Sequence, residues 1–128
     1  MSYYFSKIVD YTFDNALIKV TEELKKEGFG ILTEIDVQAT LKKKLDVDFK
    51  QYKILGACNP PLAHKALTSE DKIGVLLPCN VIVHETSDNK IEVAFMNPIE
   101  AMQAVKNDDL GKIAEEVTTK LKKVSEQL

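Results

Sequence analysis

The sequence has little of what marks several large classes of protein. It has two cysteines in 128 residues and no C-x-x-C pair, which is too few for a disulfide framework and indicates reduced thiols in the cytoplasm. Its longest apolar stretch, Val75 to Val83, is interrupted by Pro78 and Asn80 and is too short to span a bilayer. The N-terminus has no basic segment followed by an apolar core, so we expect no signal peptide.

Charge of one sign is not concentrated anywhere along the chain. Seventeen basic and twenty acidic residues give a net charge of −3, and the lysines are spread along helical stretches. We therefore expect neither nucleic acid nor an anionic membrane surface as a partner. The sequence also has no low-complexity tract, internal repeat or linker, and it indicates no cofactor. Its length and its 45% apolar composition predict one globular domain, residues 1–128.

The periodicity of the apolar residues predicts both strands and helices. Strands are expected over residues 3–10, 29–35, 52–58, 73–85 and 90–96. Helices are expected over residues 14–27, 36–45 and 109–127, with shorter ones beginning at Asn59 and Asn97. This order, β-α-β-α-β-α-β-β-α-α, predicts an α+β fold: a two-layer sandwich in which helices pack on a mainly antiparallel sheet of about five strands.

Local features predict how some of these elements pack. In the helix that Asp36 caps, the spacing of Val37, Leu41 and Leu45 places them inward. A two-residue turn at Asp88 and Asn89 would pair His84 with Val93 and Asn80 with Asn97, and a longer turn would shift this register by one residue. Because Pro78 has no amide donor, we expect a bulge there within the fourth strand.

The fourth and fifth strands carry apolar residues on both faces. Val75, Leu77, Val81 and Val83 alternate with Leu76 and Ile82, although a strand that is exposed on one face should be polar there. Helices that cover both faces of a monomer would explain this pattern. We favour a homodimer that packs through the open face of the sheet, because exposed apolar patches usually mark interfaces.

Two segments share a pattern that indicates one site. Cys58-Asn59-Pro60 and Pro78-Cys79-Asn80 each place a cysteine beside an asparagine and a proline where an apolar strand ends or is interrupted. A third asparagine, Asn97, follows the fifth strand. We therefore expect a small polar ligand to bind at a site lined by Cys58, Asn59, Cys79, Asn80 and Asn97. The alternative for the asparagines is structural, as helix caps and partners of strand-end backbone groups.

The cysteines leave further alternatives open. Both thiols can be inert and buried, as free cysteines usually are. Cys58 precedes a predicted helix, whose N-terminus would lower the pKa of a thiol that points toward it, so a redox or nucleophilic role is a second possibility. Cys58 and Cys79 with His64 and His84 are suitable ligands for a metal, but their spacing is not diagnostic. A Cys–His catalytic pair is conceivable too, although we expect His84 to be solvated.

The same segments resemble a known family. Ile54-Leu55-Gly56-Ala57-Cys58-Asn59-Pro60 and the run from Ile73 to Val81 are similar to the bacterial and archaeal domain-of-unknown-function family 302 (DUF302), as are Glu34-Ile35-Asp36 and Asp48-Phe49. The resemblance covers essentially the whole chain. It implies a two-layer α+β sandwich that forms dimers, and it brings no established activity. Many relatives carry Asp-Pro where this chain has Asn97-Pro98, so no acidic ligand is implied there.

Overall fold

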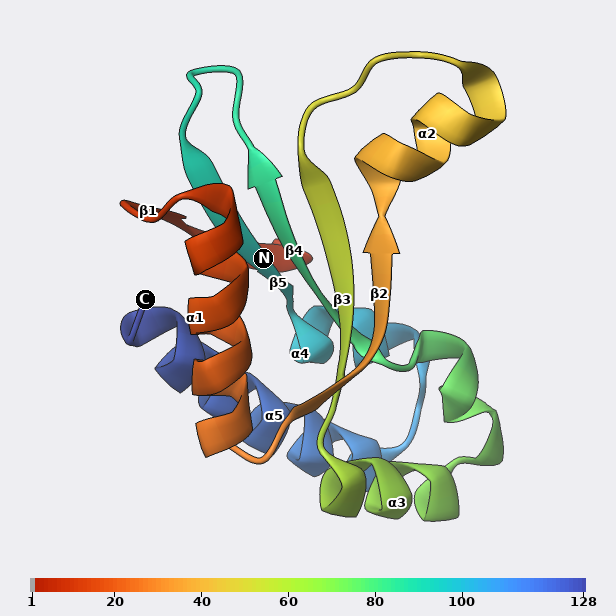
Figure 1. The fold of residues 1–128 in the computed structure, drawn as a ribbon. Helices are drawn as coiled ribbons and strands as arrows, with labels where there is room; N and C mark the ends of the chain where they lie inside the picture. Colours follow the sequence, from red (N-terminus) through yellow and green to blue (C-terminus); the bar gives the residue numbers. More distant parts are fainter. Residues whose placement is uncertain (1) are drawn as a thin grey trace.

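The computed structural model describes residues 2–128 and contains one five-stranded sheet (Figure 1). The strands lie in the order β1-β5-β4-β3-β2, and every neighbouring pair is antiparallel. Helices pack on this sheet, which confirms the predicted α+β fold. The strand bounds are β1 Tyr4–Val9, β2 Gly30–Asp36, β3 Tyr52–Cys58, β4 Cys79–Glu85 and β5 Ile91–Met96.

The helices begin close to where the capping residues predict. Side chains of Thr12, Asp36, Asn59, Asn97 and Asn107 accept hydrogen bonds from the first turns. Gly28 follows the first helix at φ +86°, a conformation that favours glycine. The bounds are α1 Phe13–Lys26, α2 Val37–Leu45, α3 Pro60–Ser69, α4 Pro98–Ala101 and α5 Asp108–Glu126, with 3₁₀ helices η1 Asp71–Leu76 and η2 Met102–Ala104.

The core lies between one face of the sheet and helices α1 and α5. Alternate residues of β4 and β5 are fully buried there, since the side chains of a strand point to opposite faces in turn. They pack with apolar side chains of both helices. The members with no exposed surface are Ala16, Val20, Leu24, Val81, Val83, Val93, Phe95 and Leu121. None of the helices within residues 2–128 has the length and apolarity that crossing a bilayer requires.

The opposite face of the sheet, here called the open face, presents the other half of each strand. Large apolar side chains on its two edge strands are exposed, namely Tyr4 and Ile8 of β1 and Ile35 of β2. Between them the face carries both apolar and polar residues: Ser6, Tyr52, Ile54, Asn80, Ile82, His84, Glu92 and Ala94. Its mixed apolar character agrees with the pattern that the sequence shows in strands four and five.

The prediction that a strand starts at Ile73 was wrong. Residues Asp71–Leu76 form η1, the Leu77–Pro78 peptide bond is cis, and β4 begins only at Cys79. The predicted bulge at Pro78 within a strand is therefore absent. The apolar residues of this run pack against helices instead: Ile73 is 1% exposed and packs with Ala66 of α3 and Leu110 of α5. Burial against helices produces the same apolar sequence as burial in a sheet.

Two details of packing also differ from the predictions. The β4–β5 turn is one residue longer than the two-residue turn, so His84 pairs with Glu92, as the alternative of a shifted register requires. The amide of Thr86 donates a hydrogen bond of 2.8 Å to the carbonyl of Lys90, and Asn89 has a positive φ of 60°. The prediction that Leu45 points inward was wrong: helix α2 lies beyond the end of β2 (Figure 1) and has no buried residue.

Candidate functional site

An apolar cavity of about 340 Å³ lies between α3, α5 and the adjacent ends of β3 and β4. We call it the cysteine cavity, because both cysteines line it. The wall is almost entirely apolar, and of the described residues that line it none carries a charge. They include Phe29, Leu32, Ala57, Cys58, Asn59, Leu62, Ala63, Ala66, Leu67, Gly74, Leu77, Pro78, Cys79, Pro98, Met102, Leu110, Ile113, Ala114 and Val117.

The sequence forms this cavity by placing small side chains where helices meet the sheet. Ala63 and Ala66 of α3 and Ala114 of α5 line it, and Ala57 of β3 contributes the sheet side. Protein interiors are close-packed, so a hollow of this size is a departure from the usual density. Its volume lies in the range of small-molecule sites, and its apolar lining is typical of them.

Strand pairing brings the two cysteines to the same cavity. Ala57 is the register partner of Cys79, and Cys58 is the next residue of β3. The adjacent Asn59 also lines the cavity but already has partners. Its Oδ1 accepts the Leu62 amide at 3.4 Å, and its Nδ2 donates to the carbonyl of Glu27 at 3.2 Å. Three of the five predicted site residues therefore lie together.

The other two predicted site residues lie elsewhere. Asn80 pairs with Gly56 and lies on the open face, since it follows Cys79 in the strand and so points the opposite way. Asn97 is buried and caps α4, where its Oδ1 accepts the Ile99 amide and its Nδ2 donates to the carbonyl of Ser2. The structure thus unites the two thiols with one amide, and Asn59 and Asn97 serve as the helix caps of the structural alternative.

Burial makes Cys79 a poor nucleophile. Burial, together with the smaller effect of the neighbouring Cys58, raises the pKa of its thiol to about 11. The thiolate is the reactive form, so we expect an alkylating reagent at pH 8 to modify half-buried Cys58 and to spare Cys79 in the folded protein. Peptide mass spectrometry measures this, with denatured protein as the control in which both react. Equal modification of both thiols in the folded protein would contradict it.

The raised pKa also has a consequence for stability. The ordinary pKa of the thiol is 9.0 and the folded value is about 11, so folding favours the neutral thiol. The contribution of this thiol to the free energy of unfolding is fully present below pH 9. It is lost as the pH rises from 9 toward 11, because the thiol ionises in the unfolded state first.

The histidines lie apart from the cysteine cavity. His64 is exposed on α3 and does not line the cavity, and His84 lies on the open face. Within residues 2–128 no group of three or more histidine, cysteine or acidic side chains is arranged to hold a metal ion. The proposed ligand set of two cysteines and two histidines is therefore not brought together.

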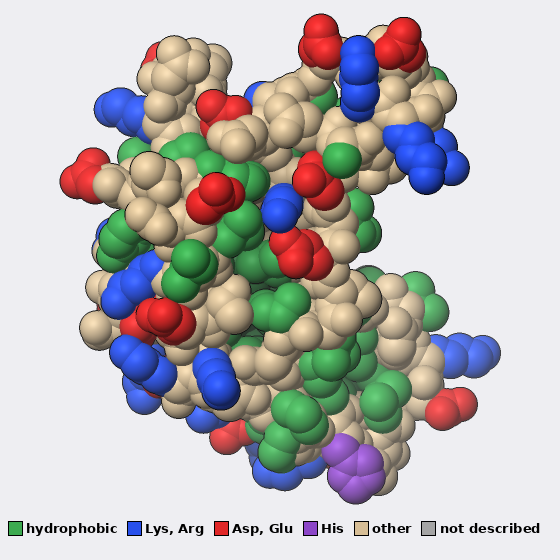
Figure 2. All heavy atoms as spheres, viewed as in Figure 1, with side chains coloured by type: hydrophobic (Ala, Val, Ile, Leu, Met, Phe, Trp, Pro, Cys, Tyr) green, Lys and Arg blue, Asp and Glu red, His purple; other side chains and the backbone are tan. Residues whose placement is uncertain are grey.

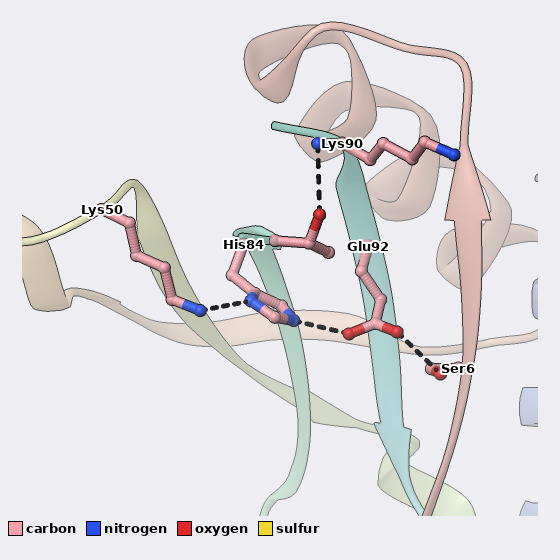
Figure 3. Close-up of polar contacts among 6 residues, drawn as sticks. Ser6, Lys50, His84, Lys90 and Glu92 are labelled. Atoms are coloured by element: carbon pink, nitrogen blue, oxygen red, sulfur yellow. Dashed lines mark hydrogen bonds and ion pairs between the residues drawn. The ribbon is translucent and has the colours of Figure 1, made fainter. Parts of the chain in front are cut away.

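A polar chain that the sequence did not reveal crosses the open face (Figure 3). Glu92 accepts from Ser6 at 3.1 Å and lies 2.7 Å from Nε2 of His84, whose Nδ1 is 3.1 Å from the ammonium of Lys50. Because an ammonium can only donate, Nδ1 is the acceptor and Nε2–H donates to Glu92. The expectation that His84 is solvated was wrong, since its side chain is 13% exposed. The longer hairpin turn, which places His84 opposite Glu92, was the missing information.

Nearly the whole chain matches a known protein family. The family model described as "Domain of unknown function DUF302" matches residues 5–128. The chain belongs to the DUF302 family. A crystal structure of an uncharacterized conserved protein DUF302 from Bacillus stearothermophilus superposes with a TM-score of 0.93, at 24% identity and with 99% and 98% of the two chains covered. At that identity the likeness shows the DUF302 fold alone, and no curated protein matches the chain.

Proposed function

We propose that this DUF302 domain is a homodimeric binding protein whose cysteine cavity takes a small, uncharged, largely apolar molecule. The observation that supports it is a cavity of about 340 Å³ whose described lining contains no charged side chain. Burying a charge there would be costly, because nothing in the wall compensates it. The amides that suggested a polar ligand do not converge, so an apolar ligand replaces that hypothesis.

The open face supports the homodimer. Tyr4 and Ile8 on β1 and Ile35 on β2 expose apolar surface at both edges of the sheet, and exposed apolar patches are typical of interfaces. In a two-fold dimer the same patch meets itself, so a net charge on it would repel its copy. Here the chain of Lys50, His84 and Glu92 balances its charges within one protomer. These side chains therefore add no net charge that would repel a second copy.

A substitution that fills the cysteine cavity tests whether an apolar ligand binds there. The 3%-exposed Ala114 on α5 faces it, so Ala114→Leu should occupy the space that a ligand needs. We expect the affinity for the uncharged fluorescent probe N-phenyl-1-naphthylamine to fall at least about tenfold, with stability unchanged or increased by about 1 kcal/mol. Fluorescence titration and thermal unfolding measure the two effects.

The matched control is Ala39→Leu, an alanine-to-leucine change at an exposed position of α2. It should leave probe binding within twofold of the unsubstituted protein. If the probe binds equally well to the Ala114→Leu variant, or if neither the probe nor the aliphatic alcohol 1-decanol binds the unsubstituted protein, the cysteine cavity is not the binding site and the proposal fails.

A further inference from the structure

We propose that the molecule bound in the cysteine cavity is an unbranched aliphatic chain, of an amphiphile or a lipid, that enters past Leu32 and Leu67 and leaves its polar end outside. This inference rests on the proposed function and narrows it to one chemical class. Three observations carry it: the composition of the wall, the extent of the cavity along two helices, and the exposed apolar side chains at its mouth.

The wall favours aliphatic over flat aromatic ligands. Among the described residues that line the cavity, Phe29 is the one aromatic ring, so a flat aromatic ligand lacks rings on both sides to stack with. The remaining apolar surface comes from alanine, leucine, isoleucine, valine, methionine and proline. The described polar groups are the two thiols, which are weak donors, and Asn59, whose carboxamide already bonds backbone groups. An aliphatic chain has no internal polar atoms, so it needs no hydrogen-bond partners from this wall.

The lining extends over about two turns of α5 and more than one turn of α3. On α5 its lining runs from Leu110 to Val117, which is a rise of about 10 Å at 1.5 Å per residue. On α3 it runs from Leu62 to Leu67, a rise of about 8 Å. The two helices pack against each other, and the extent of the lining along α5 can accommodate an extended chain about 10 Å long.

The mouth continues this apolar surface to the outside. Leu32 is 66% exposed at the irregularity of β2 between Ile31 and Thr33, and Leu67 on α3 is 41% exposed. Both line the cavity, whereas Cys79, Ala66 and Leu110 at its inner end are buried. Figure 2 shows hydrophobic side chains gathered on the lower part of this side, over the ends of β2 and β3 and over α3. A chain longer than the cavity would rest on them as it leaves.

Chain-length dependence tests the class of ligand. Primary alcohols from hexanol to tetradecanol would compete with N-phenyl-1-naphthylamine on the dimeric protein. We expect affinity to increase about fourfold for each added methylene until the chain fills the cavity and reaches the mouth. Decahydro-2-naphthol, which has the ten carbon atoms of decanol in two fused rings, should bind at least tenfold more weakly than decanol.

The outcomes separate this inference from the proposed function. Suppose that the probe binds and that Ala114→Leu abolishes its binding. If the affinity for the alcohols then does not depend on their length, or if the fused-ring alcohol binds as tightly as decanol, the proposal of an aliphatic-chain ligand is wrong, but the apolar binding site is still supported. If neither the probe nor decanol binds the unsubstituted protein, with decanol binding measured directly by calorimetry, both proposals fail. Displacement by lysophosphatidylcholine as well as by dodecanol would support a lipid chain, and displacement by dodecanol alone a free amphiphile.

A substitution at the mouth gives a second readout. Leu32→Ser should weaken binding of tetradecanol at least threefold and leave hexanol unchanged, because only the longer chain reaches the mouth. Leu45→Ser is the matched control, since Leu45 is 65% exposed on α2 and does not line the cavity. Equal loss for both alcohols, or no loss for either, would contradict the proposed path past Leu32.

Discussion

Gly56→Ala is expected to destabilise the protein by about 3 kcal/mol, which lowers the melting temperature by roughly 10 °C for a chain of this size. A Cβ atom at Gly56 would clash with Oγ1 of Thr33 on β2 and would lie 2.8 Å from Cγ of Pro78. Neither neighbour yields easily, because threonine is restricted at χ1 and the proline side chain is a ring. Thermal or denaturant unfolding at fixed protein concentration measures the loss.

Gly30→Ala is the matched control for this prediction. Gly30 lies in the adjacent strand β2, and a Cβ there would meet no atom within 4 Å. Its substitution should change stability by no more than about 0.5 kcal/mol, since it adds no clash and restricts the unfolded chain. Pro78 lines the cysteine cavity, so displacing it in the Gly56→Ala variant should also weaken probe binding. If both variants are equally stable, the close approach of Pro78 to β3 is wrong.

Ile8→Lys is expected to weaken the proposed homodimer at least about 100-fold. Ile8 lies on the open face with 47% of its surface exposed, and two-fold symmetry buries the new charge twice. The monomer should still fold, because Ile8 is the register partner of Glu92, which can pair with the lysine. Sedimentation velocity at micromolar concentration measures the change.

The matched control for the dimer is Ile18→Lys on α1. Ile18 is 57% exposed and lies on the opposite side of the sheet, so this change should leave the sedimentation coefficient as it is. A monomer in the unsubstituted protein at micromolar concentration, or a dimer that both lysines weaken equally, would show that the open face is not the interface.

The fold was largely predictable because its signals are local. Asp36, Asn59 and Asn97 mark helix starts through bonds to residues two or three positions along the chain. The segment from Ile73 to Leu77 was mistaken for strand because apolar residues are needed equally where η1 packs on Ala66 and Leu110. Leu45 was mistaken for core because an amphipathic pattern does not show whether the sheet reaches far enough to cover the helix.

The sequence allowed the meeting of the two cysteines to be predicted, but not the rest of the candidate site. Antiparallel pairing of β3 with β4 brings Cys58 and Cys79 to one cavity, as two strand ends of similar sequence indicated. Asn80 could not be placed, because its face depends on where β4 begins and a shift of one residue moves a side chain to the other face. The cavity itself arises from alanines on α3 and α5, and no local pattern distinguishes them from alanines in a filled core.

The most direct test of the cysteine cavity is a crystal structure of the protein with 11-bromo-1-undecanol, located by the anomalous scattering of its bromine. We expect a single bromine site per protomer within the cavity, between α3 and α5 and beside Cys79. Bromine bound solely on the open face, or no ordered site at concentrations that saturate the competition assay, would contradict it.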